Sequence, residues 1–83
     1  MSRRDLAHVL DVLWERSSGA AGVGVAVADI DAAIGRGHGD MRTPLNLASL
    51  ADDGRAVRLD DGVWALTAQG VAWIRADREL SDR

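Results

Sequence analysis

Apolar residues recur at a helical spacing near the start of the chain and predict an amphipathic helix over residues 4–16. The residues on its apolar face are Leu6, Val9, Leu10 and Leu13. They stand at i, i+3, i+4 and i+7, which forms a stripe wide enough to face a core. Asp5 near the predicted start and Arg16 near the predicted end complement the helix dipole. Charge and periodicity therefore agree on this element.

The next stretch predicts a brief strand followed by a second helix. Valine alternates with small residues over residues 23–27, which is typical of a short strand. A helix over Val27–Ile34 places Ile30 on the same face as both of its ends, and Gly35 suits the left-handed position that commonly follows a helix. A glycine-rich polar turn then leads to the next element.

A third helix is predicted from about Thr43. Threonine is a favoured capping residue, and Pro44 suits the first helical position because its missing N–H would have no partner there. Leu47 and Leu50 then form the buried stripe of this helix. The Asp-Asp-Gly sequence at residues 52–54 is predicted to end it.

Residues 56–66 carry the strongest local signal in the chain. Asp61-Gly62 stands between two alternating runs and predicts a β-hairpin with a type I′ turn. A two-residue loop would pair the strands as Asp60/Val63, Leu59/Trp64, Arg58/Ala65 and Val57/Leu66. One face of the hairpin would then be wholly apolar, formed by Val57, Leu59, Trp64 and Leu66. The opposite face would carry Arg58 and Asp60.

The last predicted element is a helix capped by Thr67. Val71 and Ile74 would face inward, with Trp73 as a further inward candidate. No internal repeat and no long linker separates the predicted elements, so residues 1–83 are expected to form a single small domain. The predicted fold class is α+β and mainly helical.

The order of these elements is helix, short strand, helix, turn, helix, hairpin, helix, which is the order of a winged helix-turn-helix domain. The residues that carry the resemblance are Val27-x-x-Ile30-x-x-x-Ile34-Gly35, Leu47-x-x-Leu50-x-x-x-Gly54-x-x-Val57 and Asp61-Gly62-Val63-Trp64-x-Leu66-Thr67-x-x-Gly70. Over nearly its whole length the chain resembles bacterial repressors of the MarR and PadR kinds, without their longer dimerisation helices. The fold that the resemblance implies is a three-helix core with a two-stranded wing and a C-terminal helix.

The resemblance also implies a regulator of transcription that binds double-stranded DNA, with the third helix in the major groove. The candidate DNA-contact residues are Arg36, His38, Arg42, Thr43, Asn46, Ser49 and Arg58. Arginine pairs bidentately with guanine and asparagine with adenine, whereas Arg36 and His38, just before the helix, would contact phosphates. The alternative for Arg42, Thr43 and Asn46 is an exposed, solvated helix N-terminus, and the alternative for His38 is a polar turn residue.

The charge of the chain limits the kind of DNA binding that can be expected. The formal net charge is −3, and all ten basic residues are arginine. This balance argues against a general polyanion binder, whose affinity comes from summed phosphate neutralisation. Residues 36–58 hold four arginines against three aspartates, but the tip of the predicted hairpin is acidic at Asp60 and Asp61. The alternative function is therefore a winged-helix module that binds a basic protein surface through these acids and Asp52-Asp53, and not DNA.

Catalysis has almost no support in the sequence. The chain has no cysteine and no lysine, and its serine, histidine and aspartate residues show no interpretable catalytic spacing. His38 and Asp40 are only two metal ligands, which do not make a site. We therefore expect no enzymatic activity, no cofactor and no metal.

The remaining features bear on compartment and assembly. The chain shows no signal peptide and no apolar segment long enough to span a bilayer, so a cytoplasmic protein without membrane contact is expected. Trp14 and Trp73 stand on the first and last predicted helices. They are either peripheral core residues or the contact of a homodimer, because large aromatic residues are enriched at interfaces.

Overall fold

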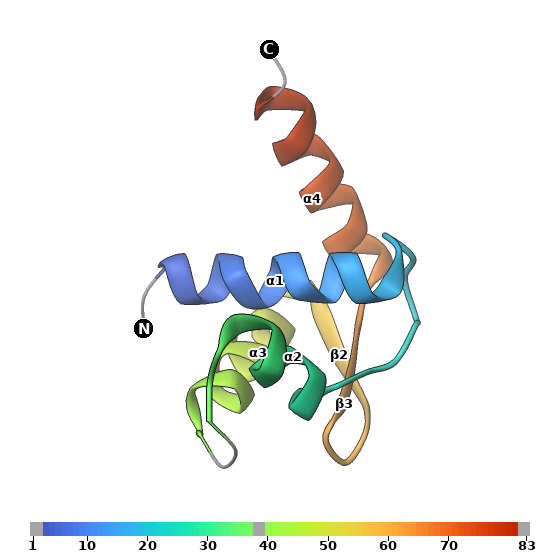
Figure 1. Cartoon of the computed structure of the whole chain (residues 1–83). Coiled ribbons are helices and arrows are strands. Elements are labelled where there is room, and N and C mark those ends of the chain that lie inside the picture. The colour runs from blue at the N-terminus through green and yellow to red at the C-terminus, as the bar shows by residue number, and fades with distance from the viewer. Residues whose placement is uncertain (1–2, 38–39, 82–83) are drawn as a thin grey trace.

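The computed structural model describes residues 3–37 and 40–81 of the chain. Its elements are α1 (Arg3–Ser17), β1 (Val25–Ala26), α2 (Val27–Ile34), α3 (Arg42–Asp52), β2 (Ala56–Asp60), β3 (Val63–Leu66) and α4 (Ala68–Ser81) (Figure 1). Over the described residues the fold is α+β and mainly helical, as predicted, with four helices and one three-stranded antiparallel sheet. No helix within these ranges has the length and apolar character needed to cross a membrane.

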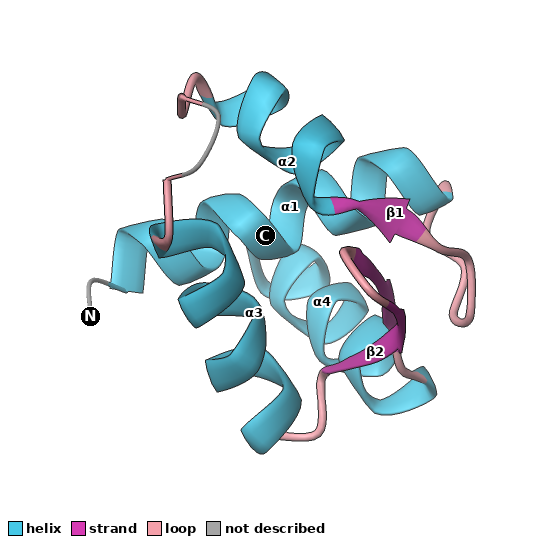
Figure 2. Cartoon of the chain, turned by 90° about the horizontal axis from the view of Figure 1, so that it is seen from below, coloured by secondary structure: helices cyan, strands magenta, loops and turns pink. Residues whose placement is uncertain are grey.

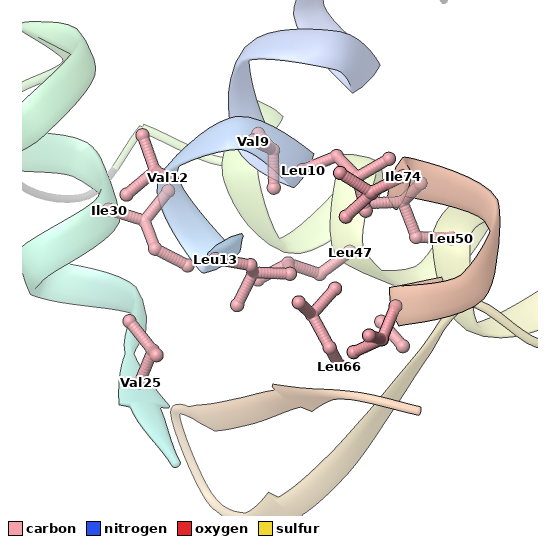
Figure 3. Packing of buried hydrophobic residues seen from close by; sticks show 12 residues of the cluster. Val9, Leu10, Val12, Leu13, Val25, Ile30, Leu47, Leu50, Leu66 and Ile74 are labelled. Carbon is pink, nitrogen blue, oxygen red and sulfur yellow. The ribbon is translucent and has the colours of Figure 1, made fainter. Parts of the chain in front are cut away.

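The other elements pack around α1. The predicted apolar stripe of this helix is confirmed, since Val9, Leu10 and Leu13 are all buried. α1 runs through the middle of the molecule, with α2 and α3 on one side and α4 on the other (Figure 1). In Figure 3, Leu13 points toward Leu47 of α3 and Leu66 of β3. The core therefore gathers around one helix and draws residues from every later element.

β1 is shorter than the predicted strand because α2 begins directly after it, at Val27. Val25 of β1 pairs with Trp64 of β3, which places β3 in the middle of the sheet. The backbone N–H of Val27 donates a hydrogen bond to the carbonyl of Gly62 in the hairpin loop (2.8 Å). β1 thereby ties the start of α2 to the hairpin.

The hairpin forms over the predicted residues, but the predicted register is wrong. Asp60 pairs with Val63 as expected, whereas Trp64 lies opposite Arg58 instead of Leu59. The register shifts between Arg58 and Asp60, so Leu59 is the extra residue of a bulge in β2. From the bulge to the base of the hairpin, every pair differs from the predicted one by one residue.

The geometry of the loop and of the hairpin base explains the shift. A type I′ turn needs a positive φ at both loop residues, and only Gly62 has one, at 70°. The loop is therefore not a type I′ turn, and the extra residue in the β2 bulge allows the two strands to pair around this different loop. At the base, Ala56 is buried opposite Leu66. Because a shift of one residue moves side chains to the other face, Val57 and Leu59 are exposed and not buried as predicted.

α4 begins where the sequence predicts it, directly after Thr67. The hydroxyl of Thr67 accepts a hydrogen bond from the backbone N–H of Gly70 (2.9 Å), which confirms the predicted cap. Val71 and Ile74 are buried as predicted, whereas Trp73 is exposed and lies outside the core. The C-terminal end of the helix lies away from the other elements (Figure 1), while Arg78 still contacts Trp14 of α1.

Candidate binding surface

The start of α3 differs from the predicted one. The helix begins at Arg42, its N-cap position is Met41, and no side chain at that position caps it. Instead, Asp40 Oδ1 accepts a hydrogen bond from the backbone N–H of Arg42 (2.9 Å). Thr43, which was expected to cap the helix, lies inside its first turn, and its hydroxyl has a different partner.

That partner is a buried arginine beneath the first turns of α3. The side chain of Arg36 is only 6% exposed, and its Nη1 donates to Thr43 Oγ1 and to Asn46 Oδ1, each at 2.8 Å. Its Nη2 lies 3.4 Å from Oδ1 of Asp5 in α1. Gly35, left-handed with φ 78°, ends α2 and turns the chain so that Arg36 points toward α3. We call Asp5, Arg36, Thr43 and Asn46 the Arg36 cluster; it joins α1, the α2–α3 connection and α3.

Three of the residues predicted to contact DNA are therefore internal, and the expectation that they are exposed is wrong. Thr43 and Asn46 are 0% and 2% exposed. They stand at i and i+3 of the stripe that Leu47 and Leu50 complete at i+4 and i+7, so the spacing itself signalled their burial. Arg36 is held between them. As described, the side chains of Thr43 and Asn46 cannot reach a base edge, and the guanidinium of Arg36, predicted to contact phosphates, is turned inward.

The exposed side of α3 is mostly apolar. Met41, just before the helix, is 65% exposed, and Leu45, one turn later, is 54% exposed. Ala48 and Asp52 continue the same side, because the four positions stand at i, i+4, i+7 and i+11. We call Met41, Leu45, Ala48 and Asp52 the α3 face. In the view from below, α3 lies on the near side of the molecule (Figure 2). Ser49, which is next to this face on the helix, is half-buried.

Arg42 is the one arginine on α3, and Asp40 holds it in place. Its Nη2 donates to Asp40 Oδ2 (2.7 Å), and its Nε donates to both carboxylate oxygens (3.1 and 3.2 Å). These side-chain hydrogen bonds, followed by the one from the backbone of Arg42, lower the pKa of Asp40 to about 2. The carboxylate is therefore ionised at neutral pH and offsets the positive charge of Arg42.

We expect the carboxyl group of Asp40 to titrate near pH 2 in the folded protein, measured by NMR of the side-chain carboxyl carbon. Arg42→Ala should raise this pKa part of the way toward 3.8, the ordinary value, because the side-chain hydrogen bonds are lost while the backbone N–H of residue 42 still donates to Oδ1. Since folding lowers the pKa, the stabilisation from ionised Asp40 is present above about pH 4 and is lost as the pH falls toward 2. The same titration near 3.8 in both proteins would contradict the described ion pair.

The remaining predicted DNA contacts do not add up to a basic patch. Arg58 is exposed on β2, but Asp60 and Asp61 at the tip of the same hairpin are exposed as well. His38 lies outside the described residues. Over residues 40–66, three arginines stand against five aspartates. The surface formed by α3 and the hairpin is therefore acidic and apolar in character.

The two tryptophans of the helices differ in their surroundings. Trp14 is half-buried and packs against the core, with the guanidinium carbon of Arg78 4.8 Å from its ring centroid. Trp73 is 43% exposed, and the guanidinium carbon of Arg55 lies 4.1 Å from its ring centroid. The sequence left two alternatives for these residues, peripheral core or a homodimer contact. Trp14 is a peripheral core residue, whereas the ring of Trp73 is exposed enough for a partner to cover it.

Two further findings bear on function. Within the described part of the chain, no three histidine, cysteine, aspartate or glutamate side chains come together in a way that could hold a metal ion. Comparison of the chain with protein-family models, with curated proteins and with solved structures finds no match.

Proposed function

We propose that this protein is a winged-helix module that binds another protein through the α3 face. The observation that carries the proposal is the composition of this face. Met41 and Leu45 expose large apolar side chains beside Arg42, the charge of which is already paired with Asp40. Thr43 and Asn46, two of the side chains predicted to contact DNA from α3, are instead buried in the Arg36 cluster.

The arrangement of the elements supports the winged-helix part of the proposal. The order α1, β1, α2, α3, β2, β3, α4 is the order on which the resemblance to winged helix-turn-helix domains rests. The connection between α2 and α3 is short, and the β2–β3 hairpin follows α3 directly, in the position of a wing. β1 adds a third strand against β3 and joins the hairpin to the start of α2.

The chemistry of the α3 face suits a protein partner. The centres of protein interfaces are apolar and rich in methionine, and a charged rim around them sets specificity. Met41, Leu45 and Ala48 would form such a centre. Asp52, Asp53 and the acidic hairpin tip would form a negatively charged rim. The expected partner therefore presents an apolar anchor among basic residues.

The same face is poorly suited to DNA. A DNA-binding surface gains affinity by neutralising phosphates and specificity by hydrogen bonding to base edges. Arg42 would have to leave Asp40 for a base or a phosphate, and the freed carboxylate would then stand beside a polyanion. The aspartates at the hairpin tip would meet the same repulsion.

Parallel selections against a random peptide library and a random duplex library, at near-physiological salt, test the proposal. We expect enrichment of peptides that combine basic residues with an apolar anchor, and no enrichment of duplexes. Leu45→Glu should weaken binding of an enriched peptide about thirtyfold, because burial of a leucine side chain contributes about 2 kcal/mol. Val23→Glu, at an exposed apolar residue outside α3, is the control and should bind the peptide as the unmodified protein does. A failure to enrich peptides, or an equal loss in both variants, would refute the proposal.

Sequence-specific DNA binding is the second candidate function. Arg42 on α3 and Arg58 on β2 are both exposed, and a winged-helix arrangement would present both to a duplex. This function would replace the first if the duplex library yielded a motif whose preference Arg42→Ala relaxes at one base position.

A further inference from the structure

The C-terminal end of α4 projects from the body of the protein, and of its side chains Arg78 reaches back to the Trp14 ring of α1. Every residue from Arg75 to Leu80 is exposed, and Leu80, a large apolar residue, is 71% exposed. Figure 1 shows α4 leaving α1 and ending well away from the other elements. Helices of proteins gain most of their stability from packing of one face, and short isolated helices are marginal in water. A covering partner would therefore stabilise this segment.

A groove opens beside the same helix. It lies between α1, the end of α3 and α4 and has a volume of about 630 Å³. Its apolar wall is formed by Leu6, Leu10, Leu50 and Trp73. The exposed ring of Trp73 belongs both to this wall and to the outer surface of α4.

An apolar stripe continues from the groove toward the C-terminal end of α4. Trp73, Ala76 and Leu80 stand at i, i+3 and i+7 and so share one side of the helix. The small side chain of Ala76 lies in the middle of the stripe, where a second helix could approach closely. The groove and the stripe together form one continuous apolar surface.

We infer that a second copy of this chain covers this surface. The two α4 helices pack antiparallel around Ala76, so that Leu80 of each copy lies against Trp73 of the other, at the mouth of the groove. A two-fold interface of this kind uses the same patch on both copies and must be complementary to itself. The patch therefore has to contain both halves of every charged contact.

The charges around the groove favour a second copy as the occupant. The rim contains Arg3 and Arg55 as positive residues and Asp53 and Asp77 as negative ones. The docking segment, residues 75–80, also carries both signs: Arg75 and Glu79 besides Asp77, which it shares with the rim, and Arg78, which contacts Asp11 and Trp14 of its own copy. A partner of one charge sign would be repelled by half of this rim, and a small molecule inside the groove would leave Leu80 uncovered. A patch with equal numbers of both signs can instead be complementary to its own copy.

The inference is independent of the α3 face. Figure 1 places α3 and α4 on opposite sides of α1, so a dimer formed through α4 leaves Met41, Leu45 and Ala48 accessible, and only Asp53 stands at the rim of both surfaces. Of the two residues expected from the sequence at a dimer contact, only Trp73 takes part. Trp14 is half-buried against the core, next to Arg78.

Sedimentation equilibrium of the full chain over a range of concentrations tests the inference. We expect a monomer–dimer equilibrium, which Leu80→Asp weakens about tenfold or more, the effect of losing about 1.4 kcal/mol. Leu80 is exposed in the single copy, so the variant should keep its far-UV circular dichroism and unfold no earlier as a monomer. Leu45→Glu, at an exposed leucine on the opposite side, is the matched control and should associate as the unmodified chain does.

A cysteine placed at the two-fold axis gives a second readout. Because the chain contains no cysteine, any disulfide in a single-cysteine variant links two copies. Ala76→Cys should cross-link on mild oxidation, whereas Ala48→Cys on the α3 face should not. A monomer at every concentration, or cross-linking of Ala48→Cys in place of Ala76→Cys, would overturn the inference. Peptide binding through α3 would survive either of these results.

Discussion

Replacement of Gly70 by alanine is expected to destabilise the protein by about 3 kcal/mol. Glycine-to-alanine changes inside helices ordinarily stabilise, by up to about 1 kcal/mol, so the sign itself is informative. A Cβ atom at Gly70 would overlap the backbone carbonyl of Arg55. A backbone atom cannot swing aside as a long side chain does, so α4 would have to separate from the base of the hairpin. That junction contains the hydrogen bonds from Thr67 to the carbonyls of Arg55 (3.1 Å) and Gly54 (2.6 Å).

Urea unfolding followed by far-UV circular dichroism measures this effect as a lower midpoint at an unchanged slope. Gly37→Ala is the matched control, because its added Cβ would have no neighbour within 4 Å and its φ lies outside the left-handed region. Its stability should be unchanged or slightly raised, since alanine restricts the unfolded chain. If Gly70→Ala proved as stable as Gly37→Ala, α4 would not rest against Arg55 as described.

The second large effect is expected at Arg36. Arg36→Met keeps an apolar stem but removes the guanidinium, which leaves the Thr43 hydroxyl and the Asn46 carbonyl buried without this partner. Each orphaned polar group costs about 1–3 kcal/mol, so the free energy of unfolding should fall by about 3 kcal/mol. The lost contact with Asp5 adds little, because that side chain is 33% exposed and solvent screens it. A domain of this size has a stability of about 4–12 kcal/mol, so the variant would retain only part of it.

A triple variant separates hydrogen bonding from packing in the Arg36 cluster. Replacing all three interior partners by apolar residues, as Arg36→Met, Thr43→Val and Asn46→Leu, removes the polar groups that the single change leaves orphaned. The urea midpoint should therefore recover much of what Arg36→Met loses. Arg42→Ala, at an exposed ion pair, serves as the surface control and should leave the midpoint nearly unchanged. A triple variant as unstable as Arg36→Met alone would show that the loss comes from packing of the arginine stem.

The two proposed surfaces would act together. A dimer formed through α4 would carry two α3 faces on its far sides, each with an exposed Leu45. A partner with two copies of the basic and apolar motif would then bind both faces, and the second binding event would occur at a high effective concentration. The Arg36 cluster contributes by holding Thr43 and Asn46 inside, which leaves the outer side of α3 to the apolar residues Leu45 and Ala48, flanked by Arg42 and Asp52.

The predictions from sequence were accurate where local interactions decide the structure. The apolar stripe of α1, both ends of α2 and the Thr67 cap of α4 each depend on residues within one or two helical turns. Gly35 adopts the predicted left-handed conformation for the same reason, since the preference belongs to the residue and its immediate neighbours. Such elements can be placed from periodicity and capping alone.

The register of the hairpin shows where local patterns stop being sufficient. Alternation and Asp61-Gly62 correctly predict two strands and their loop, but two registers one residue apart are both compatible with a short apolar run. The choice between them depends on what lies beneath the sheet. Ala56 is buried there, and Leu59 is left in a bulge. The alternation predicted one wholly apolar face, but packing against the helices buries Leu66 and leaves Val57 and Leu59 exposed.

The candidate site was decided by tertiary contacts in the same way. The spacing of Thr43 and Asn46 relative to Leu47 and Leu50 already placed them on the buried side of α3, but two polar residues there are unfavourable unless a partner satisfies them. The partner is Arg36, seven and ten residues earlier in the chain. Only the turn at the end of α2 and the packing of α1 bring that guanidinium beneath the helix. Composition and periodicity therefore determined which segments are helices and strands, while the fold decided which polar side chains remain on the surface, because burial and hydrogen bonding depend on residues that are distant in the sequence.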